Sequence, residues 1–395
     1  MFVNVKKNIK HSLGLDTQPL PQFSVEANIK QTFTDFSNED GHFNIFLPTV
    51  RASSIFGGIY TALLFLNSLQ RNHCQVRITT FDHSLSDSEK TETSAFMKAS
   101  LGLSVSISNI STISEFMSSQ PSKSDVFIAT IWYTATRIRK ILRENAFKHQ
   151  RFIYFIQDFE PGFSQWSDNY AEALTTYKKG EFLPVFNSTL LKDYFVNNRI
   201  LVLDQYFVIK PQIQTENLTL PSKLNTTKRV VFYARPTRPR NLFKTGLQGL
   251  IDWLQEYSPD VEVTTVGQPH KAIEFDRWTI KSLGKMSADE YWNTLSSYDI
   301  GLSLMLSPHP SYPPLEMAMS GVVTVTNKYE NKDMELFTNN IVSCDIDPES
   351  IKESLQEAYK RANDLESRIK NATFEFDREG VDMETVALGV KKAFA

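Results

Sequence analysis

The stretch Ser307-Pro-His-Pro-Ser-Tyr-Pro-Pro-Leu-Glu-Met-Ala-Met-Ser-Gly321 decides how the second half of this chain folds. It lies between two apolar runs, residues 300–306 and 322–326, which have the composition of buried strands. Its four prolines within residues 308–314 exclude regular structure there, because each fixes φ and removes a hydrogen-bond donor. The pattern predicts a strand, a rigid loop, a short helix and a second strand.

Proline is well tolerated in a first helical turn, so either Pro313 or Pro314 can open a helix through residues 315–319. Gly321 is the expected C-terminal stop, and Glu316 is expected in the first turn. A helix N-terminus that follows a parallel strand offers free amides to an anionic ligand. Glu316 is then either a ligand-binding carboxylate or one that is simply favoured by the helix dipole.

Composition limits the classes of function. A chain of 395 residues predicts two or more domains, and its net charge of −3 offers no bulk attraction to nucleic acid. Cys74 and Cys344 are the only cysteines in the sequence, which favours a reducing compartment. Neither a signal peptide nor an apolar run of transmembrane length is recognisable. We expect a cytoplasmic protein, at most peripheral at the inner face of the membrane.

Short apolar runs that alternate with helical spacing indicate an α/β protein with parallel sheets. In the first half, strands are expected at residues 43–48, 75–81, 125–130, 151–156 and 181–186, and the apolar residues 201–203 close this half. In the second half, strands are expected at 229–234, 261–266, 280–284, 299–306 and 322–326, with one long helix at 348–370.

The polar segment 210–228 lacks periodicity and is predicted to be a linker. Two α/β domains that are joined by a hinge suggest a cleft, and ligands of such sheets bind beyond the carboxyl ends of the strands. The candidate residues therefore lie in the loops that follow the strands.

The order of motifs in the second half resembles the nucleotide-sugar-binding domain of family-four glycosyltransferases with the GT-B fold. The matching pieces are Ala234-Arg235, Gly267, Leu283-Gly-Lys-Met-Ser287, Tyr298-Asp-Ile300 and Pro314-Leu-Glu-Met-Ala318. The resemblance implies two Rossmann-like domains that face a central cleft: residues 1–209 for the acceptor and 229–377 for the donor. It also implies that the last helix, 378–395, packs back on the first domain.

Two segments together look like the bacterial rhamnosyltransferases that build S-layer and O-antigen rhamnans: Ile156-Gln-Asp-Phe-Glu-Pro-Gly-Phe163 and residues 307–316. Family four commonly has two glutamates separated by seven residues, of which the first contacts the transferred sugar and the second the ribose. Here Glu316 matches the second, but Pro308 occupies the first position. The resemblance implies a retaining, metal-independent transfer of L-rhamnose from dTDP-rhamnose to an oligosaccharide or lipid-linked glycan, and it leaves the choice of sugar to other residues.

The resemblance also suggests roles for donor-binding residues. Arg235, Arg240 and Lys285 would neutralise the diphosphate, with Arg238 and Lys244 as rivals in the same loop. The alternative for each of these cations is a solvated surface charge. The remaining candidates are Arg51, Gly57 and Gly58 in the loop after the first strand, Tyr312, and the motif residues Pro314, Leu315 and Glu316. Gly57-Gly58 is equally compatible with a simple turn, and Tyr312 with packing on the prolines.

Asp158 and Glu160 follow a buried strand that ends at the expected cleft. Either carboxylate is a candidate for the catalytic base that takes the proton of the acceptor hydroxyl. The alternative for Asp158 is a structural role as the cap of the loop at the strand end.

Three further patterns have competing interpretations. Asp345-Ile-Asp347 matches the Asp-x-Asp metal motif, but it precedes a helix and is better explained by capping. The basic, apolar segment 137–151 is either a membrane-contacting helix or the solvated face of a core helix. The rivals to a transferase are a nucleotide-sugar epimerase or hydrolase on the same fold, and a non-catalytic nucleotide- or glycan-binding subunit.

Overall fold

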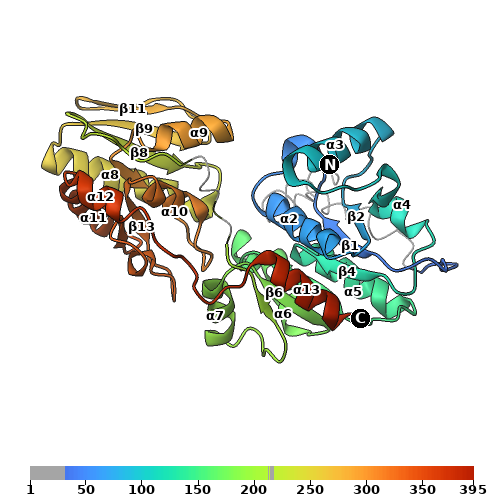
Figure 1. Ribbon diagram of the computed structural model, residues 1–395. Helices are drawn as coiled ribbons and strands as arrows, with labels where there is room; N and C mark the ends of the chain where they lie inside the picture. Colours follow the sequence, from blue (N-terminus) through green and yellow to red (C-terminus); the bar gives the residue numbers. More distant parts are fainter. Residues whose placement is uncertain (1–31, 212, 214–217) are drawn as a thin grey trace, which may run out of the picture.

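The computed structural model describes residues 32–395 except 212 and 214–217, so most of the N-terminal segment lies outside the described residues. The chain forms two α/β domains that lie side by side, each built on a seven-stranded sheet (Figure 1).

The first sheet is parallel throughout, with the strand order β3-β2-β1-β4-β5-β6-β7. Its strands are β1 (Phe43–Leu47), β2 (Val76–Thr80), β3 (Ile110–Thr112), β4 (Val126–Ala129), β5 (Phe152–Ile156), β6 (Phe182–Phe186) and β7 (Phe207–Val208). Its helices are η2 (Ala52–Ser54), α2 (Gly58–Arg71), α3 (Asp87–Leu101), η3 (Ile107–Asn109), α4 (Ile113–Met117), α5 (Trp132–Glu144), η4 (Glu160–Phe163), α6 (Asp168–Lys178) and α7 (Thr189–Asn197).

The second sheet has the order β10-β11-β9-β8-β12-β13-β14 and is parallel except for the β10–β11 hairpin. Its strands are β8 (Lys228–Ala234), β9 (Val261–Gly267), β10 (Ile273–Phe275), β11 (Trp278–Ser282), β12 (Ile300–Leu302), β13 (Val323–Asn327) and β14 (Ile341–Cys344). The helices are η5 (Pro239–Asn241), α8 (Phe243–Tyr257), α9 (Ala288–Leu295), α10 (Tyr312–Met319), η6 (Met334–Leu336), α11 (Pro348–Arg361), α12 (Leu365–Lys370) and α13 (Met383–Ala393).

In each sheet the strand order reverses at one point, and the functional site lies at these two points. In the first domain β1 lies between β2 and β4, with Phe43 opposite both Val76 and Val126. In the second domain β8 lies between β9 and β12. Loops diverge where the order reverses, which leaves a crevice beyond the carboxyl ends of the strands.

Apolar side chains cover both faces of each sheet, as buried parallel strands require. In the first domain one core layer is formed under α2, α3 and α13 and the other under α5 and α7. In the second domain α8 and α11 cover one face of the sheet, and a smaller cluster that includes residues of α9 and α10 covers the other.

Three predicted elements differ in the structure. Residues 201–203 form no strand, and Val202 is 88% exposed; β7 closes the sheet instead. The expected strand 299–306 ends at Leu302, because side chains rather than a neighbouring strand bind the backbone of Met305. The expected helix 348–370 is two helices, because the side chain of Asp364 accepts a hydrogen bond from the amide of Ser367 and starts α12 anew.

The break before α12 has a packing reason. The fully buried Arg368 of α12 forms an ion pair with Asp299 (2.7 Å between Nη1 and Oδ1), and its Nε donates to the carbonyl of Gly321 at 2.7 Å. A buried arginine of this kind needs such partners for its donors. The arrangement ties α12 to the end of α10, where Gly321 has the left-handed φ of +74° expected of a C-terminal stop.

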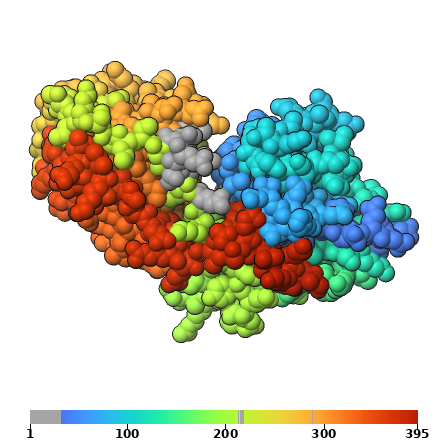
Figure 2. All heavy atoms as spheres, viewed as in Figure 1, coloured from blue at the N-terminus to red at the C-terminus, as the bar shows by residue number. Residues whose placement is uncertain are grey.

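The chain ends on the first domain. After α12 it runs back across the molecule (red in Figure 2), and Val381 forms a parallel bridge with Ile209. The buried face of α13, which includes Val386 and Val390, joins the apolar core beneath α2. This return connects the domains a second time, in addition to the segment around residues 210–227.

Candidate functional site

A cavity of about 560 Å³ lies between the domains and is lined by residues from both. It lies beyond the carboxyl ends of β1, β4, β5 and β6 on one side and β8 and β12 on the other. Seven of the residues predicted from the sequence line it: Gly57, Gly58, Asp158, Glu160, Arg235, Arg240 and Tyr312. Arg51, Lys285, Pro314, Leu315 and Glu316 are not among the lining residues.

The first domain contributes the N-terminus of α2. Gly57 precedes the helix with φ +53° and ψ −124°, a backbone conformation that residues other than glycine rarely adopt. The first hydrogen bond of the helix runs from Thr61 to the carbonyl of Gly57, so the amides of Gly58 and Ile59 have no partner within the helix. No side chain in the described part of the chain caps this end. The predicted glycine pair therefore opens a helix whose amides and dipole suit an anion.

Asp158 is held by the opposite domain. Its carboxylate forms an ion pair with Arg240 and accepts a hydrogen bond from the hydroxyl of Ser307, and its own loop adds the amide of Phe159 at 2.8 Å. Burial is the largest single influence and raises the pKa of Asp158, but the charge and hydrogen bond of Arg240, together with His309 and the hydroxyl of Ser307, outweigh it, so the pKa lies below its ordinary value. Asp158 is thus ionised, but both of its oxygens are occupied. In this structure Asp158 links the two domains, and its role as the catalytic base stays a prediction.

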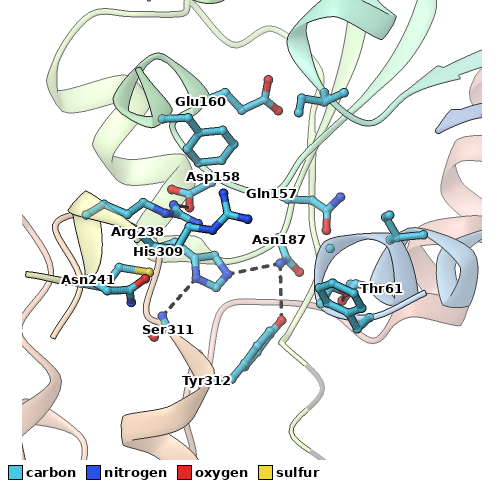
Figure 3. Close-up of a pocket in the computed structure, with 18 of the residues that line it drawn as sticks. Thr61, Gln157, Asp158, Glu160, Asn187, Arg238, Asn241, His309, Ser311 and Tyr312 are labelled. Carbon is cyan, nitrogen blue, oxygen red and sulfur yellow. Dashed lines mark hydrogen bonds and ion pairs between the residues drawn. The ribbon is translucent and has the colours of Figure 1, made fainter. Parts of the chain in front are cut away.

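Glu160 is buried on the first-domain side, apart from the residues of the second domain (Figure 3). Its carboxyl accepts hydrogen bonds from the amide of Trp132, at the start of α5, and from the hydroxyl of Tyr154 at 3.2 Å. Burial, with a small addition from the charge of Asp158, raises its pKa to about 8. Glu160 is therefore mostly protonated at neutral pH, which makes it a poor general base in this arrangement.

A second interdomain contact joins Asn187, after β6, to His309 and Tyr312 (Figure 3). Burial lowers the pKa of His309 to about 4, so its ring is neutral. Nδ1 accepts from the amide of Ser311 at 3.1 Å, which leaves the ring proton on Nε2, 3.3 Å from the amide group of Asn187. The carbonyl oxygen of Asn187 must then face His309, because a neutral imidazole cannot accept at both nitrogens.

Two arginines in the cavity carry charge that no carboxylate neutralises. Arg240 pairs with Asp158, and its guanidinium also lies 4.4 Å above the ring of Phe163. Arg235 and Arg238 line the same wall and form no ion pair within the described residues. Arg235 and Arg238 are thus the cavity-lining cations that have no ion pair among the described residues. From the sequence, Arg238 is only a rival candidate for binding the diphosphate.

Lys285 and Arg51 occupy other positions. The ammonium of Lys285 lies 5.1 Å above the ring of Phe56, a first-domain residue that lines the cavity, so Lys285 lies at the rim. Arg51 pairs with Glu89 and Asp82 and donates to the carbonyl of Ser84 at 3.1 Å. Its charge is therefore compensated within its own domain.

Helix α10 starts at Tyr312, so Glu316 lies in the second turn rather than in the expected first turn. The same start corrects the expected anion site, because Pro313 and Pro314 have no amide hydrogen to donate and the amide of Ser311 is bound to His309. The N-terminus that offers free amides to the cavity belongs to α2. Pro314 and Leu315 are buried and support the helix instead of lining the cavity.

Glu316 lies next to the cavity among tyrosines. Burial raises its pKa to about 7, opposed by the hydroxyl of Tyr291. Burial also raises the pKa of Tyr291 and of Tyr233, which lines the cavity, and the charge of Glu316 adds to both shifts. The effect on both tyrosines indicates that the carboxyl lies close to them, at the end of β8.

Several residues of the site have little signal in the sequence. Asn327 binds both the amide (2.7 Å) and the carbonyl (3.1 Å) of Met305, and the buried Lys332 donates to the same carbonyl at 2.8 Å. They fix the loop that carries His309. Gln157 and Asn187 also line the cavity, and each has one buried side-chain atom without a partner among the described residues. Their position directly after β5 and β6 was the one available clue.

The other sequence patterns are structural. Asp347 accepts from the amide of Ser350 at 2.9 Å and caps α11, as expected. In α5 the apolar residues Ile138, Ile141 and Leu142 lie in the core, and Arg139 is buried beside Glu181, so the basic segment 137–151 presents no apolar face outward. Among the described residues no helix is long and apolar enough to cross a membrane.

Comparison with known proteins gives two domain matches. Residues 42–189 match the WsaF N-terminal domain, and residues 228–356 match the WsaF C-terminal domain. An O-antigen biosynthesis protein, RfbC of Myxococcus xanthus, is 32% identical over 204 residues, which are 51% of this chain but only 15% of that protein. The chain therefore matches a small part of this much longer relative.

Solved structures share the fold over nearly the whole chain. Alr3699/HepE of Anabaena, in complex with UDP, matches with a TM-score of 0.61 at 14% identity. The match covers 89% of this chain and 99% of the Alr3699/HepE chain. Sucrose-phosphate synthase from Thermosynechococcus elongatus has a TM-score of 0.57 at 11% identity and covers 89% of this chain and 98% of its own. At such identities the likeness concerns the fold, and the two-domain architecture is the GT-B fold predicted from the sequence.

Proposed function

Since the chain carries an N-terminal and a C-terminal WsaF domain on a GT-B fold, we propose that it is a glycosyltransferase of cell-surface polysaccharide synthesis. In this proposal the second domain binds a nucleotide sugar, the first domain binds a glycan acceptor, and the sugar is transferred in the cavity between them. The role of the RfbC relative in O-antigen biosynthesis supports the same class of product.

The observation that carries the proposal is the pairing of positive groups across the cavity. Arg235 and Arg238 leave their charge unneutralised on one wall, and the uncapped start of α2 at Gly57 and Gly58 lies on the other. This arrangement suits the diphosphate of a nucleotide sugar, whose negative charge grows as the glycosidic bond breaks. Fixed donors of this kind are each worth about 3 kcal/mol of transition-state stabilisation.

Glu316 is the proposed ribose ligand, as the resemblance to family four implies. A carboxylate can accept hydrogen bonds from both ribose hydroxyls, and Glu316 lies beside Tyr233 at the end of the strand that carries Arg235. Because its pKa is about 7, the ionised form is available at and above neutral pH.

The transferred sugar would meet polar atoms that have no partner. One atom each of the Gln157 and Asn187 amides is buried without a hydrogen bond in the described structure, and such groups need one. Sugar hydroxyls supply both donors and acceptors. We expect the side chains of Gln157, Asn187 and His309 to bind the transferred sugar instead of the first glutamate of the family, because Pro308 occupies the position of that glutamate and offers no side-chain hydrogen bond.

L-Rhamnose from dTDP-rhamnose is the proposed donor, and a growing, lipid-linked glycan is the proposed acceptor. Both follow from the resemblance of residues 156–163 and 307–316 to rhamnan rhamnosyltransferases. Retention of the anomeric configuration is proposed on the same basis.

The test is nucleotide release from a panel of nucleotide sugars, with and without rhamnose-terminated oligosaccharides. We expect release that requires the acceptor and is fastest with dTDP-rhamnose. Release that is independent of acceptor would favour a hydrolase, and conversion of the donor into another nucleotide sugar without net release would favour an epimerase. Binding of dTDP without release from any dTDP-sugar would favour a non-catalytic subunit.

A matched pair of variants tests the assignment of the cations. Arg238→Gln should lower kcat/KM for the donor by about 100-fold, since it removes one charged donor to the diphosphate. Lys244→Gln removes an exposed cation that is close in sequence but absent from the cavity lining, and should have little effect. Equal effects of the two substitutions would contradict the assignment.

A further inference from the structure

An exposed aromatic pair lies on the loop between η4 and α6 of the first domain. Trp166 is 89% exposed, the largest exposed fraction among the exposed large apolar side chains. Its ring stacks on that of Tyr170, with centroids 5.1 Å apart and an interplanar angle of 30°. A tryptophan left in water costs apolar hydration free energy, so an exposed aromatic surface commonly marks a binding site.

The pair follows, in the chain, a residue that lines the cavity. Phe163, at the end of η4, is 45% exposed, lines the cavity and lies under the guanidinium of Arg240. Trp166 follows three residues later, so its Cα lies within roughly 11 Å of that of Phe163 even for a fully extended chain. Phe163, Trp166 and Tyr170 are therefore aromatic residues that lie near one another beside the cavity.

The surroundings of these aromatic residues indicate their ligand. Gln165, Ser167, Asp168 and Asn169 flank Trp166 and are exposed, and residues 160–169 contain no lysine or arginine. A surface that binds an anionic membrane pairs aromatic residues with basic ones, which this segment lacks. Amide, hydroxyl and carboxylate groups around flat aromatic rings, without basic residues, are instead the chemistry that recognises sugar rings.

We propose that Phe163, Trp166 and Tyr170 bind the acceptor glycan through the residues that precede its growing end. The C–H faces of pyranose rings pack against the aromatic rings, and the flanking amides and hydroxyls bind the sugar hydroxyls. A 6-deoxysugar adds a methyl group to the apolar face and strengthens such contacts. The inference rests on the proposed function, because it assigns the acceptor side of the same cleft.

The test compares acceptors of different length. Soluble rhamno-oligosaccharides of two and of five residues are used with saturating donor, and KM for each acceptor is measured. For the unmodified protein we expect KM to fall with acceptor length. Trp166→Ala and Tyr170→Ala should raise KM for the pentasaccharide about tenfold and leave KM for the disaccharide and for the donor unchanged.

Leu336→Ala is the matched control, because Leu336 is 81% exposed on the second domain and lies outside the cavity lining. It should change neither KM. If Trp166→Ala leaves the pentasaccharide KM unchanged, the inference is wrong. If Trp166→Ala instead reduces binding to phosphatidylglycerol vesicles without changing any acceptor KM, the aromatic pair is a membrane contact and the inference is also wrong.

A donor-free measurement separates this inference from the proposed function. Binding of the pentasaccharide alone is followed by calorimetry for the unmodified protein and for Trp166→Ala. A Trp166-dependent binding signal supports the glycan subsite even if no nucleotide sugar is turned over, in which case the proposed transferase function alone fails. Turnover without any Trp166-dependent binding refutes the subsite and leaves the transferase function standing.

Discussion

Replacing Asp158 by asparagine should weaken the docking of the two domains. The substitution removes the charge that pairs with Arg240 and places an amide against a guanidinium, while the hydroxyl of Ser307 keeps an acceptor. Breaking a buried ion pair costs about 3–5 kcal/mol, because the remaining charge loses its partner. Arg240 is 31% exposed and can be partly hydrated, so we expect the lower end, about 3 kcal/mol.

The assay is a double-mutant cycle on urea-induced unfolding, with Asp158→Asn, Arg240→Met and the double variant. We expect a coupling free energy of about 2–3 kcal/mol between the two positions. The exposed pair Arg71–Glu384, which joins α2 to α13 at 2.9 Å, is the control and should give less than about 1 kcal/mol. Unfolding is followed by circular dichroism and by fluorescence, since the loss of docking lets the domains unfold separately.

The competing interpretation makes a different prediction. If Asp158 were the catalytic base, Asp158→Asn would lower kcat by about 10²–10⁴-fold with donor and acceptor KM retained. Its coupling to Arg240 in unfolding would then be no larger than that of the control pair. That combination would refute the anchoring role of Asp158.

Three further predictions concern the cavity. Glu160→Gln keeps the shape of the protonated acid. Because the pKa of Glu160 is raised to about 8, the wild type loses stability as pH rises from about 5 to 8, so the variant should be more stable than the wild type by about 4 kcal/mol at pH 8 and not at pH 5. A pH-independent difference between the two in urea unfolding would contradict the raised pKa. Gly57→Ala places a side chain at a left-handed φ of +53°, which should lower the free energy of unfolding by about 1–3 kcal/mol and weaken donor binding. Gly180→Ala, at φ +64° outside the cavity, is the control: it should lower the free energy of unfolding by a similar amount in the same assay without changing donor KM. Glu316→Ala should weaken dTDP binding at least tenfold in calorimetry, and Asp345→Ala should not. The affinity of the wild type for dTDP should rise from pH 6 to pH 8 as the carboxyl group of Glu316 ionises. Equal losses of affinity in the two variants would exclude the ribose role.

Metal independence is a prediction that follows from the resemblance to family-four glycosyltransferases. No group of three or more His, Cys, Asp or Glu side chains within the described part of the chain is placed to hold a metal ion. Asp347, which belongs to the Asp-x-Asp pattern, is used to cap α11. A direct check is activity in excess chelator, where we expect turnover to be unchanged.

The sequence determined the architecture of this protein, because the signals for buried parallel strands are local. Runs such as residues 43–48 and 229–234 are apolar over strand length, and the prolines and Gly321 mark the loop and the stop of α10 without reference to any other part of the chain. Loops after such strands must reach the same edge of a sheet. For that reason the sequence alone predicts that Gly57, Gly58, Arg235 and Tyr312 lie near the cleft.

Only the tertiary structure decided what each polar side chain does there. Arg235, Arg238 and Arg240 are alike in sequence, but Arg240 is neutralised by Asp158, a residue 82 positions away in the other domain. Burial likewise moved Glu160 from candidate base to protonated acid, and the partners of Asn187 come from a loop 122 residues further along the chain. Charge compensation, burial and pairing depend on groups brought together across the cleft, and such distances have no local signature in a sequence.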